Sequence, residues 1–123
     1  MTKIKVICVT KNEYDLIEHF IIYYGYLFGY NNVNIIDNIS TDENVIKVYE
    51  KYIPLGINVF YEPNYEYNGQ ADAFNKYMNL EKSKCDFLIG LDTDEFLFSC
   101  ENFKNGLDPF CKNKILDTFN SYK

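Results

Sequence analysis

The sequence predicts an α/β fold in which a mostly parallel sheet is flanked by helices. Segments with strand-like and helical patterns alternate along the chain in three cycles. The strand-like segments, such as residues 3–10 and 86–91, are short and almost continuously apolar, as in strands that are covered on both faces. Because strand, helix and strand in succession form a parallel pair, this alternation favours a parallel sheet with helices on both sides.

The first cycle starts with a strand at residues 3–10, which is rich in β-branched residues. Asn12 is the expected N-cap of the first helix, because acidic residues that suit the helix dipole follow it. Apolar residues then recur at helical spacing as far as Phe28, and Gly29 supplies a stop. The next strand is expected at residues 33–36 and ends on Asp37.

The later cycles carry similar boundary signals. Ser40 or Thr41 can cap a second helix, which Pro54 and Gly56 end. The remaining expected elements are a strand at residues 57–61, a polar loop at 62–69, a helix with its apolar side at 71–78, a strand at 86–91 and one loose helix at 107–122.

The length and charge of the chain narrow the functions that it can have. Its 123 residues indicate a single domain at 1–123, with a core at 3–98 and a short C-terminal tail at 99–123. The formal net charge of −6 argues against nucleic acid or an anionic membrane as a partner. No apolar run approaches the roughly 20 residues that span a bilayer, so we expect no transmembrane segment. Arginine is absent, so phosphate contacts must come from lysine, backbone N–H groups or a metal ion.

The four cysteines have no CxxC spacing, and no secretion signal opens the chain. We therefore expect Cys8, Cys85, Cys100 and Cys111 to be reduced and mostly buried thiols. A cytoplasmic location follows as the expectation.

Polar residues gather where the predicted strands end. Ligands of open parallel sheets bind beyond the carboxyl ends of the strands, which here are residues 10–13, 37–42 and 92–95. Residues i and i+2 of an extended chain point to the same side, so Asp92 and Asp94 can share one ligand. Closely spaced carboxylates favour a hard divalent cation such as Mn²⁺ or Mg²⁺, which can bridge the protein to a diphosphate. The alternative is a solvated acidic turn.

Asp37 follows the second strand, where a carboxylate can accept a hydrogen bond from a nucleobase or a ribose hydroxyl. Taken alone, the segment from Asp37 to Asp42 favours an Asx-type turn that caps the next helix. Both interpretations stay open at this point.

Four motifs in this order carry a resemblance: KNE near residue 12, IDNISTD near 40, NGQADAFN near 70 and LDTDEF near 94. Together they resemble the metal-dependent GT-A glycosyltransferases, and most closely the family-2-like branch, over residues 3–98. The resemblance implies a Rossmann-like GT-A fold. It also implies transfer of a sugar from a nucleotide-diphosphate donor, most often a UDP-sugar, to an acceptor hydroxyl with the help of Mn²⁺ or Mg²⁺.

The resemblance also implies roles for particular residues. The residues that line the base and ribose would be Val9, Thr10 and Glu13. Asp37 or Asn38 would form a hydrogen bond to the base. Gln70 would face the sugar or ribose. Asp92 would contact ribose or the metal, and Asp94 would coordinate the metal through the diphosphate.

The sequence departs from the family pattern at several points. Ile39 stands where many relatives have glycine, and Phe74 where many have arginine. The segment after Phe98 is short for an acceptor site, and its candidate general bases are Glu101, Asp108 and Asp117. The alternative function is therefore a non-catalytic nucleotide-sugar-binding module or a degenerate glycosyltransferase. A receiver-type domain ranks third, because the third strand does not end on an aspartate.

Overall fold

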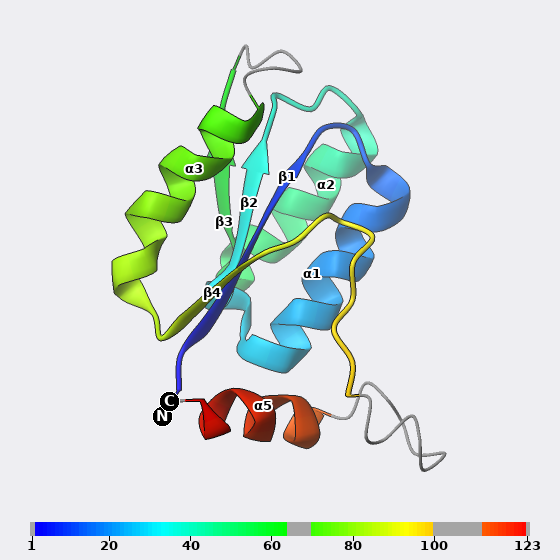
Figure 1. The fold of residues 1–123 in the computed structure, drawn as a ribbon. Coiled ribbons are helices and arrows are strands. Elements are labelled where there is room, and N and C mark those ends of the chain that lie inside the picture. Colours follow the sequence, from blue (N-terminus) through cyan, green and yellow to red (C-terminus); the bar gives the residue numbers. More distant parts are fainter. Residues whose placement is uncertain (1, 64–69, 100–111, 123) are drawn as a thin grey trace.

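The computed structural model describes residues 2–63, 70–99 and 112–122. Four strands form one sheet in the order β3-β2-β1-β4, and every neighbouring pair is parallel. The strands are β1 (Ile4–Thr10), β2 (Val33–Asp37), β3 (Asn58–Tyr61) and β4 (Phe87–Gly90). Helices lie on both sides of the sheet (Figure 1), so the predicted α/β class with a parallel sheet is confirmed.

The helices form two unequal layers. α1 (Tyr14–Phe28) and α2 (Glu43–Tyr52) cover one face, and α3 (Gln70–Glu81) covers the other. α5 (Lys112–Ser121) lies near the amino ends of the strands, beside both chain termini (Figure 1). In the described part of the chain, the short 3₁₀ turns η1 (Tyr30–Asn32), η2 (Ile53–Leu55) and η4 (Lys82–Lys84) join the elements.

β1 organises the core because it lies inside the sheet and alternates between the two layers. Val6 and Cys8 are fully buried against α1 and α2, whereas Ile7 is buried on the α3 side. This alternation is the two-residue period of a strand with apolar residues on both faces. The three carboxyl-terminal residues of β1 extend past Gly90, the last residue of β4, which pairs with Ile7. That stagger leaves room beside the end of β1.

Lys5 of β1 and Asn34 of β2 are buried polar side chains, and both have partners. The Lys5 ammonium contacts the Glu81 carboxylate of α3 at 2.9 Å. Asn34 donates to the carbonyl of Val6 at 3.1 Å and accepts from Asn58 at 3.1 Å. Buried polar groups cost free energy unless they are bonded in this way, so these pairs fix the neighbours of β1 and β2.

The helix starts differ from the prediction. α1 begins at Tyr14 with Glu13 at its N-cap, and α2 begins after Asp42, whose carboxylate accepts from the backbone N–H of Asn44. Asn12 is therefore not the cap of α1, and neither Ser40 nor Thr41 caps α2. Their side chains are used between loops instead, which a local sequence pattern does not reveal.

Within the described residues, no helix combines the length and the apolar character that crossing a membrane requires.

Candidate functional site

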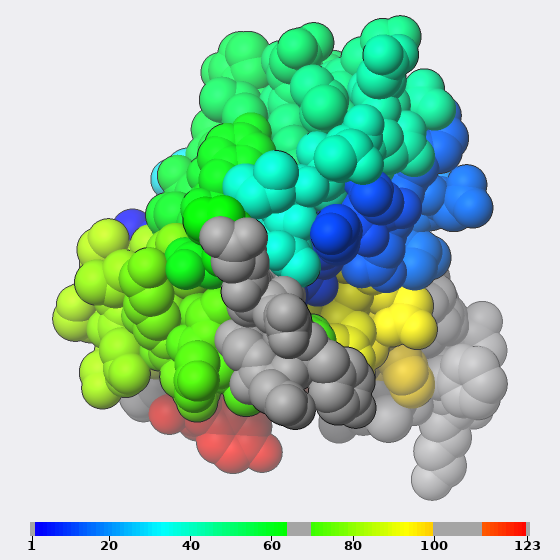
Figure 2. Space-filling view, turned by 90° about the horizontal axis from the view of Figure 1, so that it is seen from above, coloured from blue at the N-terminus to red at the C-terminus, as the bar shows by residue number. Residues whose placement is uncertain are grey.

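Three loops meet at the carboxyl end of the sheet. They follow β1, β2 and β4, and the view onto this end of the molecule shows them side by side, in blue, cyan and yellow (Figure 2). The loop after β1 is central, because it bonds to both of the others. Asn12 connects it to the β2–α2 loop, and Glu13 connects it to the segment after β4.

Asn12 has a positive φ of 54°, a conformation that asparagine tolerates better than most residues. Its backbone N–H donates to the Ser40 hydroxyl at 2.9 Å. Its side-chain oxygen accepts from the backbone N–H groups of Thr41 at 2.8 Å and Asp42 at 2.9 Å. One side chain thus holds the whole β2–α2 loop against the end of β1.

Asp37 is 1% exposed, and its carboxylate is occupied within the protein. One oxygen accepts from the Ser40 hydroxyl at 2.6 Å and the Tyr49 hydroxyl at 2.6 Å, and the other accepts from the Ser40 backbone N–H at 2.7 Å. The carboxylate closes the loop locally on Ser40, three residues later, which favours the local-turn interpretation over a free acceptor for a ligand. Asn38 lies next to it, half-buried, and its backbone N–H donates to Thr10 at 3.0 Å.

Glu13 joins the end of β1 to the acidic segment after β4. One carboxylate oxygen accepts from the Thr10 hydroxyl at 2.7 Å, and the other accepts from the Thr93 hydroxyl at 2.8 Å. Thr93 is only 3% exposed. Thr10 and Glu13, which the resemblance assigned to the base and ribose, therefore also support the loop that follows β4.

Residues 92–95 form a β-turn, not an extended strand end. The backbone N–H of Glu95 donates to the Asp92 carbonyl at 3.0 Å, and the Glu95 carboxylate accepts from the Asp92 N–H at 2.7 Å. The expectation that Asp92 and Asp94 share one side of an extended chain was wrong, because β4 ends at Gly90 and the chain reverses. All three carboxylates of the turn are exposed.

No lysine neutralises the carboxylates of this turn among the residues that the structure describes. In the same part of the chain, no group of three Asp, Glu, His or Cys side chains converges as a ready metal site. A cation bound by Asp92 and Asp94 would therefore need further oxygen ligands, which a diphosphate and water supply.

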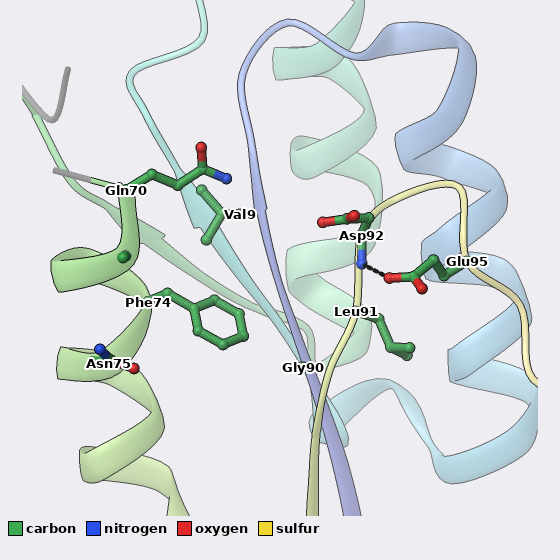
Figure 3. Close-up of a pocket in the computed structure, with 9 residues that line it drawn as sticks. Val9, Gln70, Phe74, Asn75, Gly90, Leu91, Asp92 and Glu95 are labelled. Atoms are coloured by element: carbon green, nitrogen blue, oxygen red, sulfur yellow. Dashed lines mark hydrogen bonds between the residues drawn. The ribbon is translucent and has the colours of Figure 1, made fainter. Parts of the chain in front are cut away.

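A cavity of about 460 Å³ opens between α3 and the segment after β4. This volume falls within the range of roughly 300–1,000 Å³ that is usual for small-molecule sites. Gln70 and Asp92 extend toward it from opposite sides, and Val9 lies between them (Figure 3). Its lining residues are Val9, Gln70, Ala71, Phe74, Asn75, Gly90, Leu91, Asp92 and Glu95.

The floor of the cavity is the Phe74 ring, which lies on the backbone of Gly90 (Figure 3). A Cβ atom at position 90 would lie 2.3 Å from the tip of that ring, so only glycine allows this contact. The result is a pocket with an aromatic floor, amide groups on the α3 side and carboxylates on the β4 side. Such a surface suits a flat or ring-shaped ligand that carries hydroxyl or N–H donors.

The structure thus brings together part of the predicted site. Val9, Gln70 and Asp92 line one cavity. Asp37 and Asn38 follow β2, which lies two strands from β4 in the sheet. Asp94 lies on the exposed turn. Sequence reasoning did not place Phe74 or Asn75 in the lining of the cavity. A glycine that ends an apolar strand could have indicated an aromatic ring packed on it.

Two groups that could carry chemistry are unsuited to catalysis at this site. Burial raises the pKa of the Cys8 thiol far above its usual range, and the nearby carboxylates of Glu13, Asp37 and Asp92 raise it further, so this thiol stays protonated. Asp117, a predicted candidate for a general base, lies in α5 at the opposite end of the sheet (Figure 1). Glu101 and Asp108 lie outside the described residues, as do Cys100 and Cys111.

Comparisons with known proteins give no relative: no protein-family model matches the chain, and no curated protein matches it.

Proposed function

We propose that this chain is a GT-A-type domain that binds a nucleotide-diphosphate sugar and transfers the sugar to an acceptor hydroxyl. The observation that carries the proposal is the cavity at the carboxyl end of a parallel sheet, beside a turn that exposes Asp92, Asp94 and Glu95. Parallel sheets bind their ligands at this end. A uridine diphosphate sugar is the donor that the resemblance favours.

The donor atoms of the turn fit Mn²⁺ or Mg²⁺, because both ions take oxygen ligands and keep positions for water and phosphate. Asp92 and Asp94 would hold the ion. When bound, it would neutralise charge on the leaving diphosphate. This role matters in a chain without arginine, in which no lysine lines the described cavity.

The remaining site residues would bind and orient the donor. Gln70 and Asn75 present amide groups from α3 that can bond to ribose or sugar hydroxyls, over the apolar floor of Phe74. Both oxygens of Asp37 are already bonded within the protein, so we assign recognition of the base to the neighbouring Asn38. Val9 lines the cavity, and Thr10 follows it at the end of β1, between these two parts.

The second candidate function is a nucleotide-sugar-binding module without transferase activity. It is favoured by the position of Asp117, the one tail carboxylate that the structure describes, which is remote from the cavity. An inverting transfer needs a base within hydrogen-bond reach of the acceptor hydroxyl. Release of free sugar from a nucleotide sugar would support the enzyme over the module.

A cytoplasmic location is part of the proposal. Cys8 and Cys85 are unpaired thiols, and Cys8 is buried in the core. Reduced, buried thiols are usual in proteins of reducing compartments.

The test is a thermal-shift titration with UDP, GDP and CDP, each with and without Mn²⁺. A ligand at about 100 times its dissociation constant stabilises a fold by roughly 2.7 kcal/mol. We expect a rise in melting temperature with UDP that requires Mn²⁺ and is lost in Asp94→Asn. Asp117→Asn is the matched control, because it removes an exposed carboxylate from the far end of the sheet. A cooperative melt that no nucleotide shifts, with or without Mn²⁺, would reject the proposal.

A further inference from the structure

We infer that α1 is a positioning element for the acidic turn, and that Glu13, Tyr23 and Tyr24 hold residues 92–97 in the conformation that binds the ligand. The inference rests on the proposed function, because it concerns the affinity of the same site. None of these three residues was predicted to act in this way. In Figure 1 the segment after β4, in yellow, runs alongside α1.

Tyr24 is the central contact. It is fully buried, yet its hydroxyl bonds twice to the backbone after the turn. It donates to the Glu95 carbonyl at 2.7 Å and accepts from the Leu97 N–H at 3.2 Å. Burial raises the pKa of Tyr24 to about 12, so the hydroxyl remains a donor at every physiological pH.

The neighbouring tyrosine extends this contact by one residue. The Tyr23 hydroxyl donates to the Leu97 carbonyl at 2.5 Å. The ring of Phe96 stacks on Tyr24 with an interplanar angle of 6° and meets the Tyr23 ring edge-on at 5.4 Å between centroids. Aromatic contacts of this kind add to the free energy of burial. Residues 95–97 are therefore bound to α1 through both backbone and side chain.

The other side of the turn is held at the start of α1. Glu13 accepts from the buried hydroxyl of Thr93, which lies between Asp92 and Asp94. Along the segment, the anchored residues Thr93 and Phe96 thus alternate with exposed acidic residues. The anchored groups contact α1, and the carboxylates are left to solvent.

This arrangement has an energetic consequence. Carboxylates this close in sequence repel one another, and a free segment would separate them. When the protein fold already holds the turn, a cation or a diphosphate–cation pair does not have to order it on binding. Loosening the contacts with α1 should weaken binding even though none of these side chains lines the cavity.

The test compares Tyr24→Phe and Glu13→Gln with the wild type. Tyr24→Phe keeps the ring and removes the hydroxyl, and Glu13→Gln leaves one acceptor oxygen for two threonine hydroxyls. Tyr52→Phe is the matched control, because its hydroxyl also bonds to α1, to Glu18 at 2.8 Å, but not to the turn. The probes are Mn²⁺ alone and Mn²⁺ with UDP, with free Mn²⁺ followed by electron paramagnetic resonance and amide exchange by NMR.

We expect the dissociation constant for Mn²⁺ to rise about tenfold in each variant of the α1 contacts, which is the effect of one lost hydrogen bond. Exchange of the Glu95 and Leu97 amides should accelerate in Tyr24→Phe, and Tyr52→Phe should change neither quantity. Unchanged Mn²⁺ affinity in both variants, with binding intact in the wild type, would overturn the positioning role. If the wild type itself bound neither Mn²⁺ nor UDP, the proposed function would fail first, and the positioning role with it.

Discussion

The two ends of the sheet treat carboxylates in opposite ways. At the amino end, Glu81 is 4% exposed and is paired with Lys5, itself 6% exposed. Although burial raises the pKa of Glu81, hydrogen bonding and attraction to Lys5, with a contribution from Lys84, lower it below its ordinary value. At the carboxyl end, Asp92, Asp94 and Glu95 are exposed, and no lysine is paired with them among the described residues.

The comparison distinguishes charged groups that are neutralised inside the fold from charged groups that remain available to a ligand. The Lys5–Glu81 pair is satisfied within the protein and joins β1 to α3. Among the described residues, the Glu95 carboxylate is the only one of the acidic turn with a hydrogen bond, which it accepts from the Asp92 backbone. Contacts of the following backbone with α1 fix the position of the turn. Carboxylates that are held in place but not neutralised are typical of a site that awaits a cation or a donor-rich ligand.

The largest effect is expected where the charge is buried. Glu81→Leu leaves the Lys5 ammonium without its partner in the sheet–α3 interface, and breaking a buried pair in this way costs about 3–5 kcal/mol. We expect the free energy of unfolding, measured by urea denaturation, to fall by that amount. Nucleotide binding by the remaining folded protein should persist, because the cavity lies at the other end.

The double variant Lys5→Met with Glu81→Leu is the control for this prediction. Replacing both charges by apolar side chains of similar size is often neutral, so most of the loss should be recovered. The lowered pKa also makes the wild-type pair sensitive to acid. The pair contributes fully to the free energy of unfolding above a pH of about 4.3, the pKa of a glutamate in the unfolded chain. This contribution is lost as the pH falls from there through the lower pKa of Glu81 in the folded protein. A double variant as unstable as Glu81→Leu would contradict this account of the pair.

A smaller effect is expected at the floor of the cavity. In Gly90→Ala the new methyl group collides with the tip of the Phe74 ring, and moving the ring costs about 1 kcal/mol, the lower end of the range for overpacking. The free end of the ring can turn into the cavity, so we expect nucleotide binding to weaken as well. Calorimetric titration with UDP and Mn²⁺ would measure that loss.

Phe74→Leu combined with Gly90→Ala tests the cause. The shorter side chain removes the collision, so the double variant should regain stability relative to Gly90→Ala alone. If it were instead less stable than either single variant, the contact between Phe74 and Gly90 would not be the source of the effect.

The sequence was sufficient for the elements that depend on local pattern. The apolar periods predicted all four strands and the helices α1, α2 and α3 to within a few residues, because burial on one or both faces imposes those periods. The predicted helix at 107–122 corresponds to α5 over its described part. Gly29, with a φ of 95°, ends α1 as expected.

The parts that the sequence did not predict depend on contacts between distant residues. Asn12 contacts the loop after β2, where its partner Thr41 lies 29 residues later in the sequence. The local sequence therefore could not distinguish Asn12 from a helix cap. Asp37 is occupied by Tyr49 across the β2–α2 loop. The turn at residues 92–95 is held by α1, through contacts such as that between Tyr24 and Glu95, which are 71 residues apart in the sequence. The expectation of an extended strand end was therefore wrong. Local spacing carries no signal of such contacts.

The smallest effect on stability is expected from the exposed acidic turn itself. Asp92→Asn and Asp94→Asn each remove a carboxylate that has no ion-pair partner in the described part of the chain, so the free energy of unfolding should change by no more than about 0.5 kcal/mol. A slight gain is expected, because repulsion within the turn decreases. Urea denaturation without ligand would measure it, with Glu81→Gln as the reference for a carboxylate with an internal role. A loss as large as that of Glu81→Gln would show that the turn is part of the folding core and would remove the contrast between the two ends of the sheet.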